Sequence, residues 1–528
     1  MEQAKIITAE ELGEKIKEIS IAEFFEKNRH LLGYENPTKS LLTVVKEAVE
    51  NSLDACEEAR ILPDIKVKIR EVGENRYKIV VEDNGPGIVP SKVPYAFGKF
   101  LVGSKFYRLR QSRGIQGIGI HGAILYSQLT TGKPAKITVS TGKKKIHYFE
   151  LMIDVVRNEP KVLKHETLEN KNGWHGVKIE LEIEGRYTEG RQSVINYLKQ
   201  TALVNPFARI TFIAPNNKKF VFKRVVNRLP KVPTEIKPHP YGVEIGILRR
   251  MLANTDAKIL ASFLMKDFSR IGKGTALKIC KLAKIDPKEN PKNLDYKQVE
   301  KLHKAMQMVK VKSPPTNCLS PVGEDVLTAG LKKEYNAEFY TAITRPPNVY
   351  RGYPFQVEVA LAYGGELQAD KSATLLRFAN KIPLLYHQSS CVVTEAVKEV
   401  NWRNYGLSQP SNSFPIAPLI IIVHFISVWV PFTSEGKQAI ASYPEILKEI
   451  KLALQDAGRK LAKYVRKKRR LYEKQVRRQL FERYIPEVAK SLSKLIGKNE
   501  KEIYSKLEKM VKKKIEGEKD EKTETGNK

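Results

Sequence analysis

The sequence is poor in cysteine. Its 528 residues include only four cysteines, Cys56, Cys280, Cys318 and Cys391, and none of them forms a Cys-x-x-Cys pair. Such a scattered set favours reduced thiols over a disulfide framework or a zinc site. The N-terminus also lacks the apolar core of a secretory signal. These absences predict a cytoplasmic protein.

Long apolar runs are missing as well. The most apolar stretch, from Pro418 to Pro431, is interrupted by His424 and Ser427. A membrane-spanning helix needs about 20 consecutive apolar residues, whereas a strand buried on both faces needs far fewer. We therefore predict a buried strand that continues through Trp429 and Val430, and no membrane partner.

Acidic residues are too few to balance the basic ones. Lysine and arginine total 92 and aspartate and glutamate total 59, which leaves a net charge of +33. The Lys- and Glu-rich surfaces of thermophilic proteins carry mixed signs rather than such an imbalance. An excess of this size is typical of proteins that bind a polyanion, and it favours nucleic acid as a partner.

One segment combines an apolar face with a polar edge. Residues 41–58 read LLTVVKEAVENSLDACEE. Positions three and four apart on a helix project in the same direction, so Glu47 and Asn51 can face one ligand, with Asp54 on the same edge. A carboxylate can activate water and an amide oxygen can hold Mg²⁺. The same spacing also occurs on the solvated face of any amphipathic helix.

Two glycine clusters follow. The first, Asp83-Asn84-Gly85-Pro86-Gly87, comes after a predicted strand at 77–81 and would equally suit a tight turn. The second, GIQGIGIHG at 114–122, has the GxxGxG spacing that lets backbone N–H groups approach phosphate oxygens at a helix start. It lacks the Lys-Ser/Thr ending of a Walker loop and the strand that precedes a dinucleotide-binding fingerprint.

The ordered trio of ExxxNxxD, DxGxG and GxxGxG resembles the GHKL ATPases. The resemblance implies an α/β sandwich of the Bergerat type that binds ATP and Mg²⁺. It makes Glu47 the general base, Asn51 the magnesium ligand and Asp83 the acceptor for the adenine amino group, with Gly87 leaving room for the base. The implied triphosphate contacts are Gly114, Gln116, Gly117, Ile118, Gly119, Ile120 and His121.

Between the clusters, Ser104 and Lys105 resemble the lid segment that closes over nucleotide in this superfamily, which makes both of them nucleotide contacts. The sequence departs from the family pattern on a later strand, where Gly176 precedes Val177 instead of the usual threonine. We therefore expect no hydroxyl contact there. The role of Asp54 stays open between a structural one and a water-mediated contact.

Proline clusters at 229–240 and 313–321 predict domain boundaries. We expect four parts, which are an ATPase domain at 1–230, a helical domain at 238–312, a transducer domain with a long basic helix at 313–484, and a partner-docking segment with a disordered tail at 485–528. In the helical part, Ile271-Gly272-Lys273-Gly274-Thr275 resembles the turn of a helix-two-turns-helix module, a type associated with DNA-binding proteins. A helical spacer would also fit this pattern.

In the third part, apolar residues recur at every second position, as in a strand; they are Phe355, Val357, Val359 and Leu361. Its loop at 431–438 resembles the switch loop of topoisomerase transducer domains. The resemblance implies that Lys437 reaches the γ-phosphate and takes part in both catalysis and nucleotide binding. The basic helix beyond it carries Arg466-Lys467-Lys468-Arg469-Arg470, which could contact DNA or stay solvated. Pro486 is expected to break that helix, and a tail is expected from Glu516.

Over about residues 1–480, the order of these parts resembles the B subunits of the topoisomerase VI family. The resemblance implies an α+β, ATP-hydrolysing subunit. It also implies that two B subunits dimerise on nucleotide and clamp duplex DNA, and that a separate A subunit cuts and rejoins a duplex within an A2B2 heterotetramer. The resulting strand passage relaxes supercoils and decatenates DNA at the nucleoid.

Other classes share some of these patterns. A mismatch-repair ATPase clamp has the nucleotide motifs but lacks the helical insert and the basic helix. A chaperone of the superfamily is usually acidic, and a sensor kinase needs a phosphoacceptor helix ahead of the ATP domain. A non-enzymatic architectural DNA-binding protein is hard to reconcile with an intact Glu47, Asn51 and Asp83 set.

Overall fold

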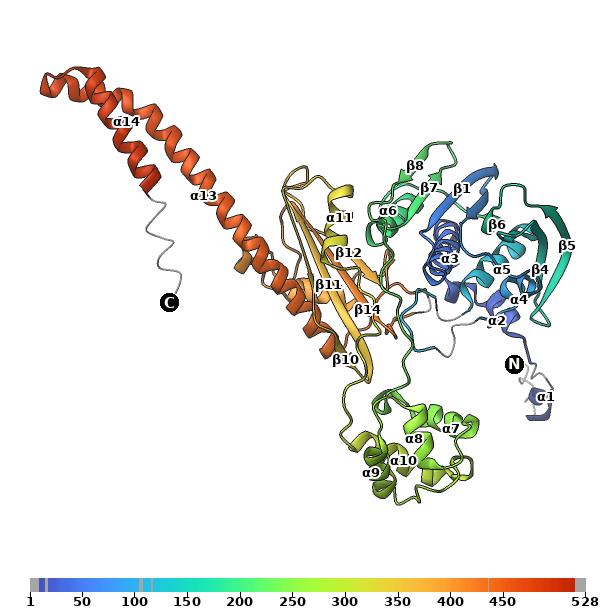
Figure 1. The fold of residues 1–528 in the computed structure, drawn as a ribbon. Helices are drawn as coiled ribbons and strands as arrows, with labels where there is room; N and C mark the ends of the chain where they lie inside the picture. Colours follow the sequence, from blue (N-terminus) through green and yellow to red (C-terminus); the bar gives the residue numbers. More distant parts are fainter. Residues whose placement is uncertain (1–8, 15–17, 104–107, 115–116, 435, 518–528) are drawn as a thin grey trace, which may run out of the picture. The chain divides into compact units, whose positions relative to one another are not determined.

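The computed structural model describes residues 9–14, 18–103, 108–114, 117–434 and 436–517 (Figure 1). The chain divides into two compact units. The larger comprises Met1–Val400 and Pro410–Ala457, and the smaller comprises Asn401–Gln409 and Gly458–Lys528. In the described ranges, no helix combines the length and the apolar character that a membrane crossing needs.

An eight-stranded sheet forms the first part of the larger unit, in the order β5-β4-β3-β6-β2-β1-β7-β8. Neighbouring strands are antiparallel except β1 and β7. The strands are β1 (Asp64–Gly73), β2 (Arg76–Glu82), β3 (Ala135–Thr141), β4 (Lys145–Asp154), β5 (Glu159–Glu169), β6 (His175–Glu184), β7 (Arg209–Ile213) and β8 (Lys219–Phe222).

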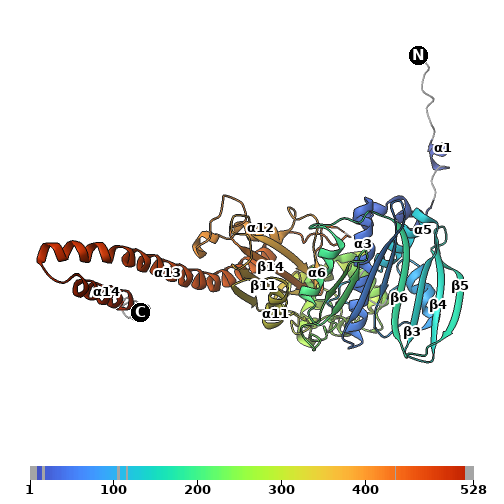
Figure 2. The same cartoon turned by 90° about the horizontal axis from the view of Figure 1, so that it is seen from above.

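Helices cover one face of this sheet (Figure 2). They are α2 (Ile21–Lys27), α3 (Pro37–Glu58), α4 (Val93–Gly98), α5 (Gly119–Thr131) and α6 (Val194–Val204), preceded by α1 (Ala9–Gly13). Helix α3 begins where the Asn36 side chain accepts from the Lys39 N–H and Pro37 fixes the first turn. Alternate residues of β1, such as Ile65 and Val67, are buried beneath the helices. The sheet and the helices that cover it form the predicted α/β sandwich.

A second sheet has the order β10-β11-β14-β12-β13, with β9 also paired to β11. Its strands are β9 (Phe339–Thr344), β10 (Asn348–Tyr350), β11 (Tyr353–Tyr363), β12 (Thr374–Ala379), β13 (Ile382–Pro383) and β14 (Leu419–Ser427), accompanied by α11 (Glu324–Glu334) and α12 (Val392–Glu399). Every residue of β14 is buried, as predicted. The strand ends at Ser427, however, so the expected continuation through Trp429 and Val430 is wrong.

Between the two sheets, the chain forms a helical module with its own core, which includes Leu248, Phe263, Ile279 and Leu302. Its helices are α7 (Ile245–Asn254), α8 (Leu260–Asp267), α9 (Lys273–Ala283) and α10 (Tyr296–Met308). The short 3-10 turns of the chain are at Arg29–Leu32, Pro90–Lys92, Pro240–Gly242, Pro291–Asn293 and Trp402–Tyr405. The four domain boundaries named above stay predictions.

Helix α13 runs from Pro444 to Ile496, and α14 runs from Glu500 to Gly517. Pro486 lies inside α13, so the predicted break is wrong. Proline removes one intrahelical hydrogen bond, and here the residue four positions earlier, Glu482, is exposed. Residues 518–528, which hold most of the predicted tail, lie outside the described part of the chain.

Candidate active site

A cavity of about 760 Å³ lies between the helical layer and the first sheet. This volume suits a small-molecule ligand. Distant segments of the chain supply its walls, because α3, the end of β2, the start of α5 and the loop after β14 all reach it. The predicted residues that line the cavity are Glu47, Asn51, Asp83, Gly87, Gly114, Gly117, Ile118, Gly119, Ile120, His121 and Lys437. Ser104, Lys105 and Gln116 lie outside the described residues.

Asp83 lines the cavity and is held in place by three hydrogen bonds. Its carboxylate accepts from the Ser52 hydroxyl at 2.8 Å, the Gly85 N–H at 2.8 Å and the Val177 N–H at 3.1 Å. Burial raises the pKa of Asp83, and these hydrogen bonds counteract the rise. Val177 therefore supports Asp83 through its backbone, although its side chain lacks the usual hydroxyl.

The fold requires glycine at position 87 for a reason other than the predicted contact with the base. Its φ is +72°, and a Cβ atom there would lie 1.9 Å from the carbonyl oxygen of Ser140 in β3. L-residues rarely adopt this φ, so the approach of strand β3 alone requires glycine. Whether the missing side chain also leaves room for a base stays a prediction.

Glu47 lies against the start of α5. A Cβ atom at Gly119 would come within 1.8 Å of the Glu47 Oε2 atom, so only glycine leaves space for this carboxylate. Within the described part of the chain, no side chain caps α5 at Ile118. The first N–H groups of a helix have no partner within the helix and can bind an anion. The Glu47 carboxylate and the N–H groups that could donate hydrogen bonds to phosphate therefore share one wall of the cavity.

Lys437 is buried rather than solvated, with a φ of +53°. Its Nζ atom lies 3.4 Å from Glu50 Oε2, and the Lys46 Nζ atom donates to the carbonyl of Gly436 at 3.0 Å. Burial alone would lower the pKa of Lys437, but the carboxylates of Glu50 and Glu47 outweigh it and raise that pKa. Lys437 therefore stays charged inside the cavity.

Glu50 and Lys46 are contacts that the sequence analysis missed. Both lie on α3, but no motif spacing distinguishes them from other charged residues of that helix. Burial raises the pKa of Glu50, while Lys437 and Lys46 act in the opposite direction. The position of Lys437 depends on this pair, which only the folded chain brings together.

Two other predicted residues are constrained by burial. Burial lowers the pKa of His121 to about 4, and the nearby backbone of Gly117, Tyr95 and Ala96 offsets only part of this effect. His121 is therefore neutral at physiological pH.

Asp54 does not line the cavity, because its Oδ1 atom forms a buried ion pair with Arg113 Nη1 at 2.8 Å. Of the two roles left open for Asp54, the structure favours the structural one.

Two family descriptions match this chain. "Histidine kinase-, DNA gyrase B-, and HSP90-like ATPase" matches residues 36–157, and "Topoisomerase VI B subunit, transducer" matches residues 314–477. The B subunit of type 2 DNA topoisomerase 6 from Methanosarcina barkeri is 48% identical over 496 residues, which cover 93% of this chain and 79% of that protein. The chain belongs to the topoisomerase VI B-subunit family.

A second family member, from Pyrococcus horikoshii, is 41% identical over 565 aligned positions that cover 98% of both chains. The 43K ATPase domain of Thermus thermophilus gyrase B overlaps this fold only weakly, with 13% identity, a TM-score of 0.40 and coverage of 90% of this chain and 98% of that domain. As a topoisomerase VI B subunit, the chain is the ATP-hydrolysing subunit of a type IIB DNA topoisomerase. This membership excludes the mismatch-repair and non-enzymatic alternatives.

Replacing Gly119 with alanine should impair ATP turnover in this family member. The new methyl group would displace the Glu47 carboxylate, and a misplacement of about 1 Å at a reacting centre can cost about 100-fold in rate. We expect a loss of at least about tenfold in kcat. Gly274→Ala is the control, because a Cβ atom at Gly274 would meet nothing within 4 Å. Equal turnover in both variants would show that Gly119 does not control the Glu47 position.

Proposed function

We propose that the cavity binds ATP with Mg²⁺ and that Glu47 is the general base of hydrolysis. The observation that carries this proposal is the convergence of Glu47, Asn51, Asp83 and Lys437 on one cavity from positions far apart in the chain. Phosphoryl transfer depends mainly on positioning and on stabilisation of charge. A cavity that combines a carboxylate, a helix start and a lysine supplies both.

Each residue has a distinct proposed task. Glu47 accepts the proton of the attacking water. Backbone N–H groups at the start of α5 and in the glycine cluster bind the phosphate oxygens, with Lys437 offsetting the charge that develops on the γ-phosphate. Asp83 accepts a hydrogen bond from the adenine amino group. The proposed nucleotide contacts of Ser104, Lys105 and Gln116 rest on the family resemblance alone.

Asn51 fits the proposed magnesium ligand. Its side chain is exposed in the cavity, and a Cβ atom at Gly114 would lie 3.9 Å from its Oδ1 atom. The described residues contain no cluster of three or more acidic, histidine or cysteine side chains that could hold a metal ion. This suits Mg²⁺, which usually takes one or two protein ligands together with substrate phosphates. When bound, Mg²⁺ offsets phosphate charge.

Lys437→Ala should reduce turnover strongly but retain nucleotide. The variant loses the positive charge that faces Glu47 and Glu50, and loss of one stabilising group at a transition state costs about 100- to 1,000-fold in kcat. Binding of a non-hydrolysable ATP analogue should weaken far less. Steady-state kinetics and calorimetry separate the two effects. Lys66→Ala is the control, because Lys66 pairs with Glu82 on the surface of the sheet. Unchanged kcat in Lys437→Ala would refute the role.

We propose duplex DNA and a DNA-cleaving A subunit as the partners of the chain. The excess of 33 positive charges supports DNA binding, and binding to the chromosome would place the complex at the nucleoid. Nucleotide-driven dimerisation of two B subunits would close a clamp around one duplex. Relaxation of supercoiled plasmid by the two subunits with Mg²⁺ and ATP tests this function. Relaxation that proceeds equally without ATP would contradict it.

The far part of α13 offers a surface for the A subunit. Tyr472, Val476, Leu480, Tyr484 and Val488 follow one another at four-residue spacing and are 39–68% exposed. Residues four apart lie on one face of a helix, so these side chains form an apolar stripe on a helix that is otherwise rich in Lys and Arg. An exposed stripe of this kind is typical of helix-mediated docking.

Leu480→Asp should weaken association with the A subunit. A charge at the centre of an apolar interface removes a contact that can be worth about 2 kcal/mol or more, so we expect about 30-fold weaker binding. Gln475→Asp introduces the same side chain at an exposed position outside the stripe. Light scattering or calorimetry with purified A subunit measures both. Equal weakening by the two variants would assign the effect to charge rather than to the stripe.

A further inference from the structure

The turn between β12 and β13 has an unusual backbone. Asn380 and Lys381 are both in the left-handed region, with φ values of +46° and +66°. Asparagine tolerates this region, but lysine seldom occupies it. Both side chains are nonetheless buried. A conformation of this kind persists when surrounding contacts determine it, and such contacts often have a functional purpose.

Asn380 connects two segments that lead to the ATP cavity. Its Nδ2 atom donates to the carbonyl of Ser112 at 3.1 Å and to the carbonyl of Ser427 at 2.9 Å. Its Oδ1 atom accepts from the Ser427 N–H at 3.0 Å. Ser112 lies just before Gly114 of the glycine cluster, and Ser427 ends the strand that leads to the Lys437 loop. One amide side chain therefore holds both segments.

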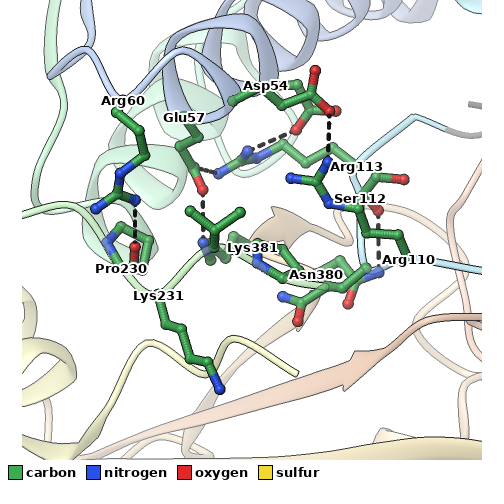
Figure 3. Close-up of a pocket in the computed structure, with 14 residues that line it drawn as sticks. Asp54, Glu57, Arg60, Arg110, Ser112, Arg113, Pro230, Lys231, Asn380 and Lys381 are labelled. Atoms are coloured by element: carbon green, nitrogen blue, oxygen red, sulfur yellow. Dashed lines mark hydrogen bonds and ion pairs between the residues drawn. The ribbon is translucent and has the colours of Figure 1, made fainter. Parts of the chain in front are cut away.

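Lys381 connects the same turn to α3. Its Nζ atom lies 2.9 Å from Glu57 Oε2, and the other oxygen of Glu57 pairs with Arg113 (Figure 3). Arg113 also pairs with Asp54 of α3 and donates to Asn205 Oδ1 at 2.5 Å. The side chains of Lys381, Glu57 and Arg113 are only 3%, 14% and 4% exposed. Helix α3, the segment before Gly114 and the β12–β13 turn therefore share one buried cluster.

This cluster is poorly explained by stability alone. Buried ion pairs lose hydration and are often no more stabilising than apolar residues of similar size. Their geometric demands are strict, however, and several ion pairs and hydrogen bonds that meet at one buried side chain favour one arrangement of the segments they join. The segments fixed here are the ones that carry Glu47, Gly114 and, through β14, Lys437.

We propose that Asn380 and Lys381 are positioning residues for ATP turnover. They hold the segment before Gly114 and the start of the Lys437 loop against α3, so that Lys437 and Glu47 keep their places on the cavity. This inference rests on the proposed roles of Glu47 and Lys437. It adds a part of the transducer sheet, far from the nucleotide in the sequence, to the residues that set the rate of hydrolysis.

Two variants of the full-length chain test the proposal. Asn380→Gly keeps the left-handed backbone accessible and removes only the side-chain hydrogen bonds. Lys381→Met keeps most of the side-chain volume and removes the charge. We expect each to lower kcat by at least about tenfold, as a small misplacement of reacting groups does, with little change in analogue binding. Lys199→Met is the control, because Lys199 forms another charged contact, 3.9 Å to Glu334, between α6 and α11.

Combining Asn380→Gly with Lys437→Ala distinguishes positioning from general destabilisation. If Asn380 acts through Lys437, the double variant should turn over no more slowly than Lys437→Ala alone. Full multiplication of the two losses, or a wild-type kcat in both turn variants, would overturn the proposal. Thermal unfolding of each variant identifies any effect that is due to loss of the fold.

Hydrogen exchange separates failure of this proposal from failure of the proposed site roles. Asn380→Gly should speed amide exchange at 108–114 and 427–434, which include its partners Ser112 and Ser427, while Lys199→Met should not. Unchanged exchange in both segments would refute positioning by Asn380, whatever the role of Lys437. Wild-type turnover in Lys437→Ala alone would instead refute the role of Lys437.

Discussion

Glu47→Ala is expected to abolish measurable ATP turnover while leaving nucleotide binding intact. The Glu47 carboxylate lies against Gly119 at the start of α5, on the same wall as the helix N–H groups that would bind phosphate. No other carboxylate of α3 lines the cavity, since Glu50 pairs with Lys437 and Asp54 with Arg113. Loss of a general base costs about 100- to 10,000-fold in rate.

The matched control for this variant is Glu58→Ala. Glu58 lies at the end of the same helix, is exposed and does not line this cavity. Its replacement should leave kcat within about twofold of wild type, as expected for a surface site. Analogue affinity, measured by calorimetry, should be similar in all three proteins. Wild-type kcat in Glu47→Ala would show that another group accepts the proton.

Asp83→Asn should lose nucleotide affinity rather than kcat alone. The amide is isosteric, and its oxygen can still accept from the Gly85 and Val177 N–H groups, while Ser52 can turn to accept from the new NH2 group. What disappears is the charge of the proposed acceptor for the adenine amino group. A hydrogen bond to a charged group is worth about 1.5–3 kcal/mol, so we expect about 10- to 100-fold weaker binding of ATP analogues.

Glu82→Gln controls for a neighbouring change of charge. Glu82 precedes Asp83, but its side chain pairs with Lys66 at the surface of the sheet. Calorimetric titration of both variants with an ATP analogue and with a guanine nucleotide provides the measurement. If Asp83→Asn bound the adenine nucleotide as tightly as wild type, Asp83 would be a structural residue held by Ser52, Gly85 and Val177, and the adenine contact would lie elsewhere.

The sequence predicted the parts of this site that depend on local pattern. The spacing of Glu47 and Asn51 is a property of one helix, and the two glycine clusters mark a turn after β2 and the start of α5. Each of these features is encoded within about ten residues. Their meeting at one cavity was expected only from the family resemblance, because periodicity within one segment does not fix its distance from another.

Contacts between distant segments could not be predicted in this way. Lys437 was expected to reach the γ-phosphate, but no sequence pattern indicated that it is buried against Glu50, 387 residues earlier in the chain. Asn380 belongs to no recognised sequence motif, and its proposed positioning role follows only from its hydrogen bonds to Ser112 and Ser427. The break expected at Pro486 was wrong because local propensity is a weak guide that the context of a long helix can override.

The central claim, an ATP-operated clamp, is tested most directly by the mass of the purified chain in solution. Light scattering would be recorded with Mg²⁺ alone and with Mg²⁺ and a non-hydrolysable ATP analogue, at a concentration where calorimetry shows the analogue bound. The clamp predicts a monomer without nucleotide and a dimer with it. A chain that binds the analogue and stays monomeric would contradict the clamp.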